Sequence, residues 1–128
     1  MNENLTSIPK SLAKRGKLDS GVFHKLDLTE RLFHSTDFIG MDLRGTFFNK
    51  TVFLGCTFLN SSLITTVFQY SIFIDCVIET SRLRYAEFAN AVIIDCIFRE
   101  ADLFMTDFSG SHILRTNFVN SNQDDAIF

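Results

Sequence analysis

The sequence repeats with a period of five residues over most of its length. From Phe38 to Phe118, every fifth residue is Leu, Phe or Ile. The residue two positions before each of these is Thr, Ser, Cys or Ala, with Met41 as the one exception. Neither an α-helix, with 3.6 residues per turn, nor a simple strand, with a period of two, produces this spacing. The pattern therefore predicts a solenoid, in which short units stack on one another.

A second period, four times as long, is superimposed on the first. Cys56, Cys76 and Cys96 recur with this period of twenty, and the apolar positions form columns of Leu or Phe with the same spacing. These columns are Leu43, Leu63, Leu83 and Leu103, and Phe48, Phe68, Phe88 and Phe108. Four units therefore make one coil, and residues one coil apart become neighbours at the strand spacing of ~4.8 Å.

The units resemble those of the pentapeptide repeat family, whose consensus is A(D/N)LXX. Residues 36–40 (TDFIG), 41–45 (MDLRG), 101–105 (ADLFM) and 106–110 (TDFSG) match it closely. The resemblance implies an all-β fold, a right-handed quadrilateral β-helix with four units per coil. With coils of this length, residues 21–128 give about five coils.

The ends of the chain depart from the repeat. Residues 1–20 lie outside it and contain a predicted short helix over residues 8–15, which would either cap the solenoid or provide a basic anchor. Residues 21–35 keep the apolar phase without the small residues and predict an irregular first coil. Residues 120–128 form the end coil, in which a polar run precedes Ala126, Ile127 and Phe128.

Length and charge restrict the remaining choices. The 128 residues suit one domain, and no stretch approaches a membrane span or a signal peptide, so we expect a cytoplasmic protein. The net charge is −3, and residues 36–128 alone carry six basic and eleven acidic groups. This balance disfavours direct binding of nucleic acid by the repeat.

No combination of residues predicts catalysis, a cofactor or a metal. The cysteines are odd in number and lack metal-ligand spacing, and His24, His34 and His112 have no second ligand nearby in the sequence. The cysteine column has two interpretations, a redox or metal site and small apolar fillers of the interior; the second is favoured because Thr and Ser share the position. We expect a protein that is not an enzyme.

The period of twenty also predicts ion pairs between coils. Each pair joins residues one coil apart, which would stabilise the register modestly because such pairs are exposed. The expected pairs are Glu79 with Arg99, Arg82 with Asp102, and Asp95 with Arg115.

One outward face is expected to be aliphatic. If the apolar centres point inward, their sequence neighbours point outward, and on three faces these are mixed in polarity. On the fourth they are Val52, Leu54, Ile72, Ile74, Val92, Ile94 and Leu114. A contiguous apolar patch usually marks an interface, although residues 1–20 could instead cover it.

The sequence thus favours a scaffold that docks a protein partner, or forms a homodimer, through this aliphatic face. The resemblance implies an alternative, because some pentapeptide repeat proteins mimic DNA and bind DNA gyrase and related topoisomerases. The predicted stack of coils is about 22 Å long, and that length of B-DNA carries roughly 13 phosphates. The net negative charge of residues 36–128 is smaller than this. A further hypothesis is an end-to-end contact through Ala126, Ile127 and Phe128.

Overall fold

The computed structural model describes residues 25–128, which form a parallel β-solenoid with no helix in that range. Two five-stranded parallel sheets lie on neighbouring sides. The first contains β1 (Leu32–His34), β3 (Val52–Leu54), β5 (Ile72–Ile74), β7 (Val92–Ile94) and β9 (His112–Leu114). The second contains β2 (Asp37–Ile39), β4 (Thr57–Leu59), β6 (Val77–Glu79), β8 (Ile97–Arg99) and β10 (Asn117–Val119).

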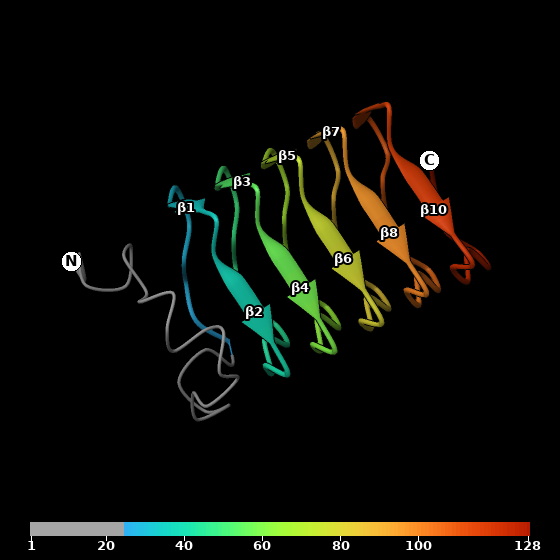
Figure 1. Cartoon of the computed structure of the whole chain (residues 1–128), viewed down its shortest axis with the longest axis horizontal. Coiled ribbons are helices and arrows are strands. Elements are labelled where there is room, and N and C mark those ends of the chain that lie inside the picture. The colour runs from blue at the N-terminus through green and yellow to red at the C-terminus, as the bar shows by residue number, and fades with distance from the viewer. Residues whose placement is uncertain (1–24) are drawn as a thin grey trace.

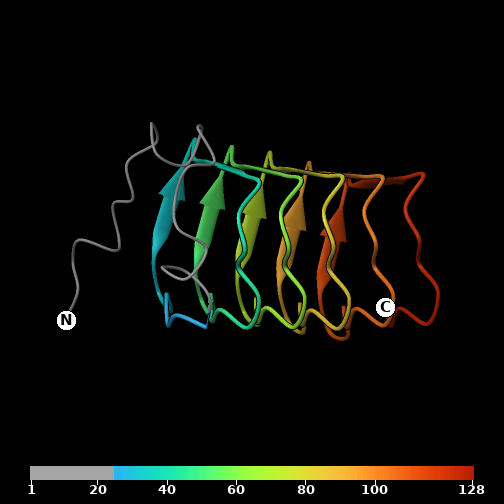
Figure 2. The same ribbon diagram turned by 90° about the horizontal axis from the view of Figure 1, so that it is seen from below.

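The other two sides of each coil are joined by isolated parallel bridges. One series runs from Asp42 to Asn122 and the other from Asp27 to Ile127, and each step joins residues one coil apart. Within both sheets the partners have the same separation, as Phe53 and Phe73 do. The coils stack along one axis (Figures 1 and 2). The four-sided coil predicted from the period of twenty is confirmed.

The apolar centres fill the interior, as the period of five predicts. From Leu28 to Phe108 they are all buried. Aromatic rings one coil apart lie nearly parallel, because the coils hold identical side chains one above the other. Phe48 and Phe68 have ring centroids 5.3 Å apart, and Phe88 and Phe108 have centroids 4.9 Å apart.

The small residues two positions earlier also point inward, and Thr, Ser and Cys side chains among them bind backbone carbonyls. The hydroxyl of Thr66 donates to the carbonyl of Leu43 at 2.8 Å, and that of Thr106 donates to the carbonyl of Leu83 at 2.7 Å. Both of these bonds join consecutive coils. A larger side chain would compete with the aromatic columns for space, which explains the restriction to small residues.

The corners between the sides are left-handed. Every fifth residue from Lys25 to Asp125 has a positive φ, and only four of these residues are glycine. A left-handed conformation costs roughly 1–2 kcal/mol for other residues. The corners are held by backbone hydrogen bonds to the next coil, such as the N–H of Asn60 to the carbonyl of Glu79 at 3.1 Å.

Two of the three predicted ion pairs are confirmed and one is wrong. Arg99 contacts Glu79 at 3.5 Å, and Arg115 contacts Asp95 at 2.6 Å. The expected pairing of Arg82 with Asp102 is replaced by Arg84 with Asp102, at 2.6 Å. The guanidinium of Arg84 also lies 4.9 Å from the ring centroid of Phe104. Arg84 therefore contacts two residues of the next coil, Phe104 in its own column and Asp102 in the column of Arg82. The predicted helix over residues 8–15 lies outside the described residues.

Candidate docking surfaces

The aliphatic side chains predicted to form an interface lie on the outer face of the first sheet. Their strands stack in register, so that they form two columns. One column is Val52, Ile72 and Val92, and the other is Leu54, Ile74, Ile94 and Leu114. We call these seven residues the aliphatic face. Most are half-buried because neighbouring strands flank them, whereas the side chain of Leu114 is 51% exposed.

The structure extends this face by one residue that the sequence interpretation missed. Leu32 on β1 pairs with Val52 and is 56% exposed. The sequence did contain a signal for Leu32, because this residue lies one full coil before Val52 and is followed by Phe33, which keeps the apolar phase. The regular small-residue pattern begins only at Thr36, however, which hides the preceding coil.

The rim of the aliphatic face is polar and contains one large aromatic side chain. Tyr70, at the corner before β5, is 58% exposed. At the opposite corner Arg115 binds Asp95, and this hydrogen bond lowers the pKa of the Asp95 carboxyl. An apolar centre with a polar, aromatic-containing rim is the usual composition of a protein–protein interface.

The residues predicted to make an end-to-end contact lie on the last coil. Phe128 stacks on Phe108, with ring centroids 5.0 Å apart, and continues the aromatic column. Phe128 is nevertheless 59% exposed and Ile127 is 54% exposed, while Ala126 is half-buried. Contact with another molecule through these residues stays a prediction.

The cysteine column is internal. Each of the three thiols is buried, and each donates to a carbonyl of the preceding coil, as Cys56 does to Phe33 at 3.2 Å. Hydrogen bonds with the thiols of Cys56 and Cys96, together with burial, raise the pKa of Cys76. Within residues 25–128, no group of three or more His, Cys, Asp or Glu side chains is placed to hold a metal.

The described histidines are far apart. His34 lies on β1 and His112 on β9, the two outer strands of the first sheet. His24 lies outside the described residues. In the part of the chain that the structure describes, no helix is long and apolar enough to cross a membrane.

Comparison with known proteins agrees with this architecture. The family model for pentapeptide repeats matches residues 32–69 and 71–110 in eight copies. No curated protein sequence matches the chain.

Several solved structures are similar to this chain. HetL, a pentapeptide repeat protein involved in heterocyst differentiation regulation from the cyanobacterium Nostoc sp. strain PCC 7120, is 12% identical with a TM-score of 0.40. That match covers 78% of this chain and 50% of HetL, so the chain spans half the length of HetL.

Two further solved structures extend the comparison. A pentapeptide repeat protein from the Arabidopsis thaliana thylakoid lumen is 19% identical, with a TM-score of 0.38 and coverage of 86% of this chain and 70% of that one. QnrB1, a plasmid-mediated fluoroquinolone resistance protein, is 18% identical, with a TM-score of 0.30 and coverage of 81% and 66% respectively.

Proposed function

The chain belongs to the pentapeptide repeat family, and we propose that it is a cytoplasmic, non-enzymatic scaffold that docks a protein through its aliphatic face. The docked protein is either a separate partner or a second copy of the chain. The observation that carries this proposal is the pair of aliphatic columns on the outer face of the first sheet. The buried core does not require them, because the inward side chains already fill it.

The size of the face indicates how a partner would use it. Five strands spaced ~4.8 Å apart give a strip about 19 Å long. A standard interface buries about 800 Å² on each partner. The strip is therefore the apolar centre of a larger contact that includes rim residues such as Tyr70.

The test is a triple variant in which Ile72, Ile74 and Ile94 are each replaced by Glu. The matched control replaces Leu59, Val77 and Ile97, which are half-buried and point outward on the second sheet. Mass in solution and affinity capture from a lysate are measured for wild type and both variants. We expect a dimer or a specific partner with wild type and the control, and neither with the aliphatic-face variant. A monomer that captures the same proteins in all three forms would contradict the proposal.

The alternative is binding to DNA gyrase or a related topoisomerase as a DNA mimic. The distribution of charge argues against it. Of the eleven acidic groups in residues 36–128, Asp42, Glu79, Asp95 and Asp102 are already paired with arginine. A supercoiling assay distinguishes the two functions, because inhibition or protection of gyrase by micromolar protein would favour the DNA mimic.

A further inference from the structure

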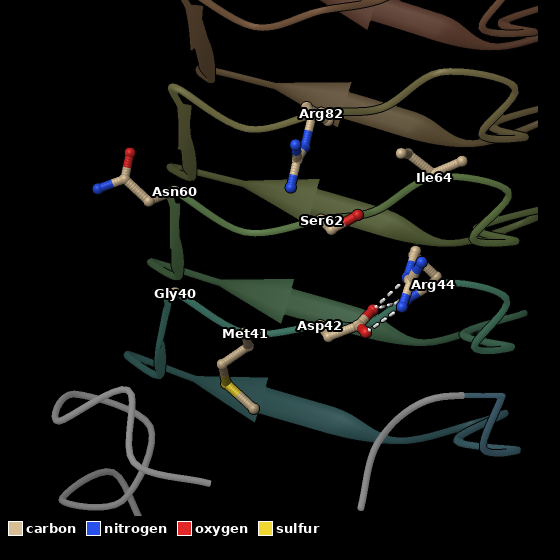
Figure 3. Close-up of a pocket in the computed structure, with 8 residues that line it drawn as sticks. All are labelled: Gly40, Met41, Asp42, Arg44, Asn60, Ser62, Ile64 and Arg82. Carbon is tan, nitrogen blue, oxygen red and sulfur yellow. Dashed lines mark hydrogen bonds and ion pairs between the residues drawn. The ribbon is translucent and has the colours of Figure 1, made fainter. Parts of the chain in front are cut away.

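A hollow of about 370 Å³ lies on the side of the solenoid joined by the bridges from Asp42 to Asn122. Figure 3 shows its lining residues, which come from successive coils. The side chains that matter here are Asp42, Arg44, Ser62, Ile64 and Arg82. Within a coil this side and the aliphatic face are separated by one side in each direction. The hollow is thus on the opposite side and is independent of the proposed docking.

Ser62 lines this hollow with an unsatisfied hydroxyl. Ser62 is 8% exposed, and its Oγ has no hydrogen-bond partner among residues 25–128. A buried hydroxyl without a partner is unfavourable, and such groups in folded proteins call for an explanation. The Oγ is shielded from solvent, so a ligand in the hollow can accept its hydrogen bond only after a neighbouring side chain moves.

Arg82 supplies an unpaired positive charge beside this hydroxyl. Its side chain extends from its own coil towards the coil of Ser62 (Figure 3). The two nearby carboxylates are occupied, Asp102 by Arg84 and Asp42 by Arg44, each at 2.6 Å. Among the described residues the Arg82 guanidinium has neither an ion pair nor a hydrogen bond.

The balance of charge in the hollow is opposite to that of the whole protein. Two arginines and one aspartate line it, whereas the chain carries a net charge of −3. Arg44 is held in place by two hydrogen bonds to Asp42, of 2.8 and 2.6 Å. A planar guanidinium presents paired donors that match the oxygens of a carboxylate or a phosphate.

We infer that this hollow binds an oxyanion, either a phosphate or a carboxylate group, on a small molecule. Arg82 donates two N–H groups to two of its oxygens, and the Ser62 hydroxyl donates to the same group once the side chains that shield its Oγ have moved. The volume is at the lower end of the range for small-molecule sites, roughly 300–1,000 Å³. It leaves space for an attached organic portion against the side chain of Ile64.

The experiment is a titration of the ¹⁵N-labelled full chain with inorganic phosphate and, separately, with acetate, at constant ionic strength. We expect saturable shifts of the amide signals of Ser62 and Arg82. Arg82→Gln should weaken binding about tenfold, through loss of a charge-assisted pair. Ser62→Ala should weaken it about fivefold. The control Arg99→Gln removes the same charge from the second sheet, where Arg99 pairs with Glu79, and should leave binding unchanged.

The two anions separate the sources of the oxyanion. Saturation by phosphate alone assigns a phosphorylated ligand, saturation by acetate alone assigns a carboxylate, and saturation by both supports a site for either group. Shifts that rise linearly with concentration, or that are unchanged in Arg82→Gln, would overturn the inference. Dispersed amide spectra of each variant establish that it is folded.

Discussion

Phe58 stacks on Phe38 of the preceding coil, with ring centroids 4.6 Å apart and an angle of 6° between the planes. Phe58 is fully buried, and its ring also packs edge-on against Phe53 and Phe68. Phe58→Ala should therefore lower the free energy of unfolding by about 3–5 kcal/mol, measured by urea denaturation. Phe128→Ala is the control, because Phe128 is 59% exposed and should cost much less. Equal losses would show that burial does not determine how much a ring in these columns stabilises the protein.

The inward hydroxyls should contribute separately from the apolar core. Thr66 is buried and donates to the carbonyl of Leu43, which also accepts the N–H of Thr46 at 3.1 Å. Thr66→Val keeps the shape but removes this hydrogen bond, so it should lower the free energy of unfolding by about 1 kcal/mol. Thr57→Val is the control, since Thr57 points outward on β4. No loss for Thr66→Val would mean that only the size of the side chain matters at this position.

The period of five identifies which residues are buried, and the period of twenty identifies which residues are neighbours. Both follow from backbone geometry that every coil repeats. The pairing of Arg84 with Asp102 does not, because it runs diagonally between columns and involves the ring of Phe104. The left-handed corners were not predicted either, since glycine marks only four of them.

The charge of the hollow likewise depends on which side chains pair with one another. Ser62 is a small residue in a column between Asp42 and Arg82. The small side chain of Ser62 between the larger side chains of Asp42 and Arg82 indicates that the surface is hollowed at this position. They do not show that Arg84 occupies Asp102 and leaves Arg82 unpaired, because this depends on side-chain conformation.

Ser62→Ala should stabilise the protein in the absence of any anion. The substitution removes a buried hydroxyl that has no partner among the described residues. We expect the free energy of unfolding to rise by up to about 1 kcal/mol in phosphate-free buffer. Ser61→Ala is an adjacent control that should destabilise, because the Ser61 hydroxyl donates to the carbonyl of Phe38 at 3.0 Å. Loss of stability in Ser62→Ala would indicate that its hydroxyl is already satisfied within the protein.

The ion pair between Asp95 and Arg115 should make stability depend on acid pH. The hydrogen bond from Arg115 lowers the pKa of Asp95 below its ordinary value of 3.8. A carboxyl whose pKa is lowered on folding stabilises the protein above its unfolded value, and that contribution is lost as the pH falls through the folded value. The melting temperatures of wild type and Arg115→Gln should therefore differ at neutral pH and converge below the lowered pKa. Lys50→Gln, which removes an exposed charge elsewhere, should show no such convergence.

The cysteine column provides a measure of how often the coils open. All three thiols are buried, so a reagent reaches them only when the coils open, and the thiolate is the reactive form. At about pH 8, the folded protein should react with an aromatic disulfide reagent only as fast as it opens, and all three thiols should react in denaturant. Asn117→Cys, at an exposed position on β10, should add one thiol that reacts at once. Phe58→Ala should accelerate the slow reaction, because it increases the population of opened molecules. Rapid reaction of any native thiol in the wild type would instead favour the interpretation of the cysteine column as a redox site.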